Sequence, residues 1–327
     1  MKPKILVTRE VFDDTLAYLG EHCEVEANQG DKPFDPVILA ERLRDKEGVI
    51  CCLTDRIDSS VLAVSPRLKV VANIAVGYNN IDVPACTSRG VMATNTPGVL
   101  DDSTADLAWT LMLATARRLT EAEAYVRAGL WNGWHLKQML GVDVHHATLG
   151  VIGMGRIGQA IVRRAAGFKM KVLYHNRNRL PGDVERWLNA EYAGKDELLA
   201  QADFVVLQMP YSPATHHYIG EAELRKMKPS AILINSTRGG VIDDAALVRA
   251  LKEGTIRGAG LDVYENEPRL NPGFLDLKNV VLAPHVGSST EATRRAMAMS
   301  AARNAVAALS GETPPNLHNP QAKAKAQ

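Results

Sequence analysis

The sequence is poor in cysteine, and its few thiols form no recognisable framework. Its four cysteines are Cys23, Cys51, Cys52 and Cys86, and they show neither metal-ligand spacing nor the pattern of a disulfide scaffold. Cys51 and Cys52 lie in an apolar run over residues 49–53. We therefore expect reduced thiols in the core of a cytoplasmic protein, and we predict no metal site.

Net charge and long hydrophobic runs are also lacking. The formal net charge is +1, so nothing in it favours binding to nucleic acid or to an anionic membrane. No apolar run approaches the length that spans a bilayer, and the opening MKPKILVTRE reads as a first strand rather than a secretory leader. These absences leave a soluble enzyme as the expected class. Its length of 327 residues predicts two domains, each with its own core.

What the chain does contain is a regular alternation of short apolar runs with amphipathic stretches, which predicts parallel sheets with crossover helices. The expected strands are residues 5–7, 49–53, 70–72 and 91–94 in a first series, and 149–152, 172–174, 204–207, 232–235, 258–261 and 280–282 in a second. Long helices are expected over residues 103–118 and 291–309. The tail beyond Gly311 is expected to be extended and frayed at its end.

This order predicts an α/β fold with two Rossmann-like domains that contain parallel sheets. A cofactor domain, residues 101–286, is expected to be inserted into a discontinuous, flavodoxin-like substrate domain of residues 1–100 and 287–327. The six strands expected in the middle of the chain match a complete dinucleotide-binding sheet.

The most informative motif is G-M-G-R-I-G, which lies between an apolar run and a helical stretch. Gly153 permits the tight turn out of the strand, Gly155 lets the backbone approach a pyrophosphate, and Gly158 lets the helix pack closely on the sheet. The free N–H groups at the start of that helix bind anions, and Arg156 adds a positive charge. The strand, helix and strand context favours a dinucleotide site over an ordinary turn.

The usual acid for the adenosine ribose is missing from this motif. The position 18 residues after Gly158 holds Asn176, and Arg177 and Arg179 follow it. An uncharged residue with neighbouring arginines suits a ribose that bears a 2′-phosphate, so we predict a preference for NADP(H), with NAD(H) as the alternative. The competing interpretation is that both arginines are ordinary surface residues of a loop.

Three polar clusters follow the later strands, where ligands bind in open α/β sheets: residues 235–240, 262–268 and 283–289. Arg238 can hold the carboxylate of an α-keto acid and polarise the adjacent carbonyl. His285 can give a proton to an oxyanion, and Glu267 can orient the imidazole and favour its protonated form. Each alone has a structural alternative, and Glu265 competes for the role of Glu267. Three complementary groups after successive strands nevertheless favour a catalytic site.

These motifs, together with N-I-A-V-G-Y-N-N-I-D-V at residues 73–83 and N-T-P-G-V-L at residues 95–100, resemble the D-2-hydroxyacid dehydrogenase family. The resemblance spans nearly the whole chain and is closest to the glyoxylate/hydroxypyruvate reductase and 2-ketogluconate reductase branch. It implies a reduction of small 2-keto acids to D-2-hydroxy acids, with a histidine as proton donor. The chain departs from the NAD-preferring members of the family at Asn176, where they carry an acid, so we expect NADPH as the reductant.

The same resemblance assigns roles to individual residues. Val76 and Gly77 offer backbone N–H groups to the substrate carboxylate, Arg238 binds and polarises the substrate, and Glu267 pairs with the acid/base His285. Residues 207–210 are expected to lie along the cofactor. The further cofactor contacts that the resemblance implies are Thr104, Ile157, Met209, Pro210, Ser236, Thr237, Asp262, Gly287 and Ser288.

The family also implies a homodimer that pairs through the segment after the interdomain helix, roughly residues 119–146. This segment carries Trp131, Trp134, Leu136 and Met139, which is more apolar than a free loop tolerates. The alternative is that these side chains pack within their own subunit.

Two other functions stay open. The first is an NAD-dependent D-2-hydroxyacid dehydrogenase of another specificity, such as a phosphoglycerate or lactate type. The second is a nucleotide-sensing corepressor-like binding protein, because the fold also carries that class. The chain shows no segment that resembles a regulatory extension.

Overall fold

The computed structural model describes residues 1–325, and the chain divides into two compact units. Unit 1 comprises Met1–Leu100 and Ser289–Gln327, and unit 2 comprises Asp101–Ser288. Each unit contains one sheet in which every strand pair is parallel. The predicted α/β fold with two parallel sheets, one unit inserted into the other, is therefore confirmed. No helix among residues 1–325 is both long enough and apolar enough to cross a membrane.

The sheet of unit 1 has five strands in the order β2-β1-β3-β4-β5, the flavodoxin-like order. Its strands are β1 (Lys4–Val7), β2 (Glu24–Ala27), β3 (Gly48–Cys51), β4 (Val70–Asn73) and β5 (Met92–Thr94). Its helices are α1 (Asp13–His22), α2 (Pro36–Leu43), α3 (Ser59–Ala63), α4 (Val83–Ser88), α12 (Glu291–Leu309) and the 3₁₀ helix η4 (Pro320–Lys325). Strand β2 was not predicted, because its sequence EVEA alternates charged residues at an edge of the sheet and forms no apolar run.

The tail after α12 packs along β5 and then forms η4, so it is not extended throughout, and the fraying expected at its end falls outside the described residues. Leu317 pairs with Thr94 in an isolated antiparallel bridge, and the buried Asn319 accepts a hydrogen bond from the Ala93 N–H. The side-chain amide of Asn319 donates to the Val91 carbonyl. The tail therefore supplies partners for backbone groups at an edge strand, which would otherwise need water.

The sheet of unit 2 has seven strands in the order β12-β11-β10-β9-β6-β7-β8, which is a Rossmann arrangement with one strand added. Its strands are β6 (Thr148–Ile152), β7 (Lys171–His175), β8 (Ala190–Tyr192), β9 (Phe204–Leu207), β10 (Ile232–Asn235), β11 (Gly258–Leu261) and β12 (Val280–Leu282). The sequence predicted six of them. It missed β8, a short edge strand of which only Ala190 is buried.

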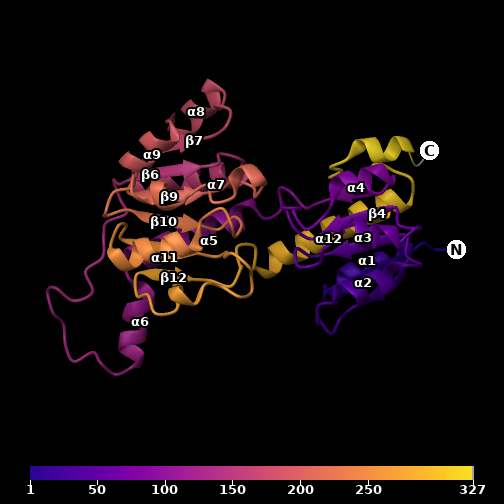
Figure 1. Cartoon of the computed structure of the whole chain (residues 1–327), viewed down its shortest axis with the longest axis horizontal. Coiled ribbons are helices and arrows are strands. Elements are labelled where there is room, and N and C mark those ends of the chain that lie inside the picture. Colours follow the sequence, from indigo (N-terminus) through magenta and orange to yellow (C-terminus); the bar gives the residue numbers. More distant parts are fainter. Residues whose placement is uncertain (326–327) are drawn as a thin grey trace. The chain divides into compact units, whose positions relative to one another are not determined.

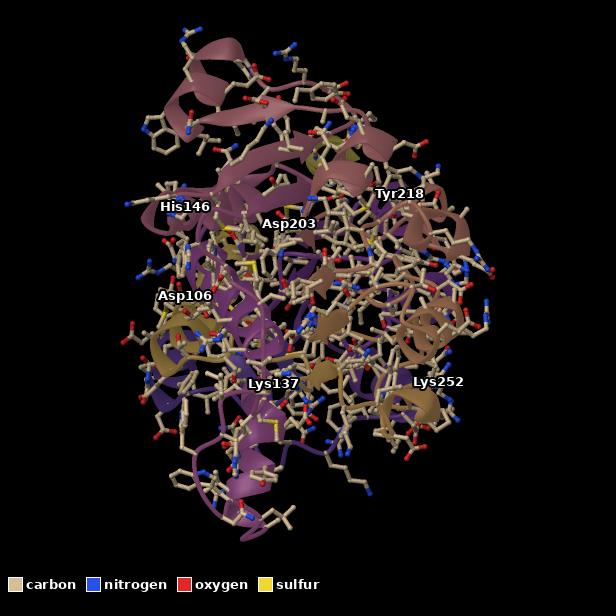
Figure 2. All side chains as sticks on the ribbon, turned by 90° about the vertical axis from the view of Figure 1, so that its left-hand side faces the viewer. Asp106, Lys137, His146, Asp203, Tyr218 and Lys252 are labelled. Atoms are coloured by element: carbon tan, nitrogen blue, oxygen red, sulfur yellow. The ribbon has the colours of Figure 1, made fainter. Side chains whose placement is uncertain are left out.

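Helices cover both faces of this sheet. They are α5 (Asp101–Ala116), α6 (Leu119–Arg127), α7 (Arg156–Ala165), α8 (Gly182–Leu188), α9 (Lys195–Gln201), α10 (Glu221–Leu224) and α11 (Asp244–Glu253), with short 3₁₀ turns η1 (Ala166–Phe168), η2 (Pro213–Thr215) and η3 (Pro272–Phe274). Alternate residues of the buried strands enter two separate cores, one beneath α5 and α7 and the other beneath α9, α10 and α11. Asp106 of α5 and Lys252 of α11 accordingly lie on opposite sides of this unit (Figure 2).

The chain leaves the sheet of unit 2 after α5. The predicted long helix ends at Ala116 because Arg118 adopts a left-handed backbone conformation with φ 53°, and α6 begins directly after it. Figure 1 shows α6 and the segment that follows it extending away from the sheet. Trp134 and Leu136 in this segment are 76% and 77% exposed, so they do not pack within their own chain.

Candidate active site

The glycine motif forms a tight turn between β6 and α7. Gly153 has φ 103°, and a Cβ atom there would lie 2.3 Å from the carbonyl oxygen of Gln208. A Cβ atom on Gly158 would lie 2.2 Å from the Gly153 oxygen, so α7 approaches the turn too closely for any side chain. A Cβ atom on Gly155 would meet nothing within 4 Å. The turn thus leaves open space at the glycine that is expected to face a pyrophosphate.

The start of α7 supplies anion donors to this space. Gly155 is the N-cap and contributes no side-chain cap, so the first N–H groups of the ten-residue helix are left for a ligand. Arg156 and Ile157 occupy the first turn of α7. Asn176, at the end of β7, accepts a hydrogen bond from the Met154 N–H at 2.7 Å and so holds the turn in place. These residues fit the pyrophosphate of a dinucleotide.

The two arginines after β7 have different surroundings. Arg179 makes a bidentate ion pair with Glu185, at 2.8 and 2.9 Å, and its guanidinium lies over the Tyr192 ring. Hydrogen bonds from Arg179 and Tyr174 hold the pKa of Glu185 at about 2, so that carboxylate stays ionised. Arg177 is exposed, and its side chain makes no hydrogen bond or ion pair with any residue among 1–325.

The other expected cofactor residues follow successive strands of the same sheet. Met209 and Pro210 follow β9, and Ser236 and Thr237 follow β10, where the Gln208 amide donates to the Ser236 hydroxyl at 2.7 Å. The carboxyl ends of parallel strands share one edge of the sheet, so these loops and the glycine turn lie on the same side.

Asp262, Gly287 and Thr104 converge at this edge. A Cβ atom on Gly287 would lie 3.2 Å from the Asp262 carboxylate and 3.4 Å from the Thr104 methyl group. The buried Asp262 carboxylate accepts hydrogen bonds from the Val286 and Gly287 N–H groups at 2.7 and 2.8 Å. Burial raises the pKa of Asp262, and these hydrogen bonds oppose that shift. Asp262 therefore fixes the loop from residue 285 to Ser288.

His285 and Glu267 form a direct pair, which we call the histidine–glutamate pair. The Nδ1 atom of His285 lies 2.8 Å from Oε2 of Glu267, and the two side chains are 24% and 28% exposed. His285 has φ 57°, a conformation that non-glycine residues seldom adopt and that clusters at functional sites. The His285 N–H donates to the Asp262 carbonyl at 2.9 Å, which holds this backbone in place.

The ionisation of Glu267 determines which nitrogen of His285 is available. Burial alone would raise the pKa of Glu267, but the hydrogen bond and charge of His285, the Tyr264 N–H and the charge of Arg238 outweigh it, so the pKa is lowered. An ionised carboxylate accepts hydrogen bonds only, and Nδ1 must therefore carry the proton that it shares with Glu267. The Nε2 atom of His285 is left to exchange a proton with a substrate.

Arg238 lies in the turn after β10, and Asn235 shapes this turn. The Asn235 side chain accepts from the Thr237 N–H and hydroxyl and donates to the Arg238 carbonyl. The Arg238 guanidinium donates to the Thr237 carbonyl at 2.7 Å. Burial lowers the pKa of Arg238, and the negative charge of Glu267 opposes that shift. The planar guanidinium of a partly buried arginine suits the capture of a carboxylate.

Glu265 has different partners from Glu267. Its carboxylate lies 2.5 Å from Nε2 of His217 and accepts a hydrogen bond from the Asp244 N–H. Among residues 1–325, His216, His217 and Glu265 are the one group whose potential metal-ligand atoms lie within 4.8 Å of one another. The two histidine rings stack with their centroids 3.9 Å apart. Of the two candidate carboxylates, only Glu267 contacts His285.

Val76 and Gly77 lie in unit 1, in a loop after β4 that we call the 75–77 loop. The carbonyl groups of Ala75, Val76 and Gly77 accept hydrogen bonds from the Thr96 N–H, the Asn95 side chain and the Asn73 side chain, in that order. The N–H groups of Val76 and Gly77 have no acceptor among residues 1–325.

Three positioning residues were not predicted from the sequence. Asn73, Asn95 and Asn235 each hold a backbone segment that carries an expected site residue. All three end or follow a strand, and they lie within the motifs at residues 73–83, 95–100 and 235–240. Asparagines are common in loops for many reasons, so this signal alone does not separate them from ordinary turn residues.

Comparison with known proteins identifies the family. Residues 109–287 match the family model described as D-isomer specific 2-hydroxyacid dehydrogenase, NAD binding domain. The glyoxylate reductase of Thermococcus gammatolerans is 50% identical over 323 residues, which cover 98% of this chain and 96% of that protein. The glyoxylate reductase of Aeropyrum pernix is 46% identical, with 97% and 96% covered.

A solved structure agrees with these relatives. The NADPH-dependent glyoxylate/hydroxypyruvate reductase from Sinorhizobium meliloti, in complex with NADP and malonate, aligns with a TM-score of 0.88 and 33% identity, over 99% of this chain and 98% of that one. The resemblance predicted from the sequence is confirmed. The glycine turn, the histidine–glutamate pair and these similarities lead to one conclusion: the chain is an oxidoreductase of the D-isomer specific 2-hydroxyacid dehydrogenase family, with an NAD-binding domain.

Proposed function

We propose that this enzyme reduces small 2-keto acids, glyoxylate and hydroxypyruvate foremost and 2-ketogluconate as a further candidate, to D-2-hydroxy acids with NADPH. The observation that carries the proposal is the histidine–glutamate pair, which combines a shared proton on Nδ1 with a free Nε2. Relatives that are 50% identical and bear the name glyoxylate reductase support the substrate class.

In this proposal, His285 supplies the proton for the new hydroxyl group. The bound cofactor supplies the hydride that adds to the keto carbon. As the carbonyl π electrons move to oxygen, Nε2 of His285 gives its proton to that oxygen, and the imidazole stays oriented by Glu267. The products are the 2-hydroxy acid and the oxidised cofactor, so atoms and charges balance.

Arg238 would bind the substrate. The planar guanidinium of Arg238 can hold the carboxylate and stabilise negative charge that develops on the adjacent carbonyl oxygen. The unpartnered N–H groups of Val76 and Gly77 are suitable donors to a carboxylate. Neither contribution requires a metal ion.

The NADPH preference rests on the region after β7. Asn176 has no charge to repel a 2′-phosphate, and Arg177 is exposed and without an ionic partner among residues 1–325. Arg179 is a weaker candidate because it is already paired with Glu185. The solved Sinorhizobium relative is NADPH-dependent and was crystallised with NADP, which agrees with this preference.

We also propose that the protein is a cytoplasmic homodimer paired through residues 119–146. Leu130, Trp131, Trp134 and Leu136 are 58–77% exposed, and an apolar surface of this kind favours burial in a partner. Light scattering should give twice the chain mass of 35.5 kDa, and replacing Trp134 and Leu136 with serine should give monomers. A wild-type chain that elutes as a monomer would rule out the pairing.

The decisive experiment for the activity is a panel of keto acids with both reduced cofactors. We expect the highest kcat/KM for glyoxylate or hydroxypyruvate with NADPH. A preference for phosphohydroxypyruvate or pyruvate with NADH would instead identify a phosphoglycerate- or lactate-type dehydrogenase. Tight cofactor binding without turnover of any keto acid would favour the corepressor-like alternative.

A further inference from the structure

Three carbonyl groups of the 75–77 loop are all engaged by donors from the interior of unit 1. The Thr96 N–H donates to the Ala75 oxygen at 3.0 Å, and the Asn95 side chain donates to the Val76 oxygen at 2.8 Å. These peptide bonds are trans, so the C=O of one residue points opposite to the N–H of the next. Holding the Ala75 and Val76 oxygens therefore turns the N–H groups of Val76 and Gly77 away from the interior.

Asn95 is in turn held by α12, although the two residues are 209 positions apart in the sequence. The side-chain amide of Asn304 donates to the Asn95 carbonyl at 3.0 Å. The other end of the Asn304 side chain accepts hydrogen bonds from the backbone and side-chain N–H groups of Asn316. Asn304 is 0% exposed and Asn95 is 6% exposed, so water cannot replace these partners.

We propose that Asn304 and Asn95, which we call the asparagine chain, are positioning residues that orient the N–H groups of Val76 and Gly77 toward the carboxylate of the substrate. The proposal rests on the proposed function for the nature of that substrate. Both asparagines are neutral, so they add no charge beside the substrate carboxylate. They fix the Val76 and Gly77 N–H groups before substrate binds. A loop free to rotate would lose that orientation on average and would bind the carboxylate less tightly.

The first test is a kinetic comparison of variants. Asn304→Leu keeps the approximate volume and removes both the donor and the acceptor, and Asn95→Ala removes the contact to the Val76 carbonyl. We expect KM for glyoxylate to rise about 3–10-fold in each, with kcat within about twofold and an unchanged Kd for NADPH. Both changes interrupt the same series of hydrogen bonds. KM for glyoxylate in the double variant should therefore be no higher than in the more severe single variant.

Asn319→Ala is the matched control. Asn319 is 2% exposed, and it makes hydrogen bonds to Thr87, Val91 and Ala93 but none to Asn95 or to the 75–77 loop. It should lower the melting temperature as Asn304→Leu does and leave KM unchanged. An equal rise in KM in this control would show that KM reports general stability, and the proposal would fail. If Asn304→Leu does not fold, Asn95→Ser tests the same chain, because its hydroxyl is too short to reach the Val76 oxygen.

A second readout does not depend on turnover. Oxalate, added to the ¹⁵N-labelled enzyme with NADP⁺ bound, should shift the Val76 and Gly77 amide resonances saturably, and with a higher Kd in Asn304→Leu. Failure of the wild type to reduce glyoxylate would overturn the proposed function, whereas the oxalate shifts would still decide the role of the asparagine chain. Unshifted Val76 and Gly77 resonances, or an oxalate Kd that is equal in wild type and variant, would overturn this inference.

Discussion

The candidate catalytic groups of unit 2 and the 75–77 loop of unit 1 differ in the kind of polar group that they present. In unit 2, the histidine–glutamate pair and Arg238 use ionisable side chains, and the charges of His285 and Arg238 help to lower the pKa of Glu267. In unit 1, the 75–77 loop presents backbone N–H groups held by neutral asparagines. Proton transfer requires a group that can change its charge, whereas binding a carboxylate requires only fixed donors. Loss of the histidine–glutamate pair should therefore affect kcat, and loss of the asparagines that hold the 75–77 loop should affect KM for the keto acid.

The largest effect is expected from His285→Ala. Without the imidazole, no group delivers a proton to the developing oxyanion, and kcat should fall by roughly 10²-fold or more. Binding of NADPH, measured by fluorescence titration, should be largely kept. His318→Ala is a useful control because it removes an exposed histidine of unit 1. Near-normal turnover by His285→Ala would show that this residue is not the proton donor.

Substitution of Arg238 should change both KM and kcat, because Arg238 is expected to hold the carboxylate and to stabilise the oxyanion. Arg238→Lys keeps the charge and loses the planar fork, so KM should rise and kcat should fall, each by about tenfold. Arg238→Ala should be more severe. Steady-state kinetics with glyoxylate measure both parameters. If either variant kept both values, Arg238 would not contact the substrate.

The two arginines after β7 offer a comparison within the cofactor site. A charge-assisted contact to the 2′-phosphate contributes about 1.5–3 kcal/mol, so Arg177→Ala should raise KM for NADPH roughly tenfold or more and leave that for NADH unchanged. Arg179→Ala should have the smaller effect, because its guanidinium is committed to Glu185. The reverse order would show that the ion pair opens when cofactor binds. A higher kcat/KM with NADH in the wild type would show that neither arginine binds a 2′-phosphate.

The smallest effect expected is a change in pH profile from Glu267→Gln. The pKa of Glu267 is lowered, so the side chain is a carboxylate throughout the neutral range and accepts the Nδ1 proton of His285. Protonation of Glu267 at acid pH removes that acceptor, so kcat for reduction should show an acid limb, and glutamine, which does not titrate, should abolish it. Glu265→Gln is the matched control, since Glu265 contacts His217 instead. An unchanged pH profile of kcat in Glu267→Gln would show that Glu267 takes no part in proton transfer.

Much of the fold could be predicted because buried parallel strands read as continuous apolar runs. The strands missed were β2 and β8, which lie at sheet edges and carry charged or exposed residues. The packing of the tail after α12 could not be predicted for a related reason. Its contacts with β5 depend on Leu317 and Asn319 meeting a strand more than 220 residues earlier, and no local pattern reports such a meeting.

The sequence by itself determined the chemistry that is available: a glycine turn for a dinucleotide, an arginine, a histidine and carboxylates after successive strands. These features are readable because spacing along a strand, turn and helix is local. Only the tertiary structure decided which carboxylate meets His285, which arginine is already paired, and which asparagines hold the 75–77 loop. Those outcomes depend on distances between segments far apart in the chain, and the strength of a charge or hydrogen bond is decided by such distances and by burial.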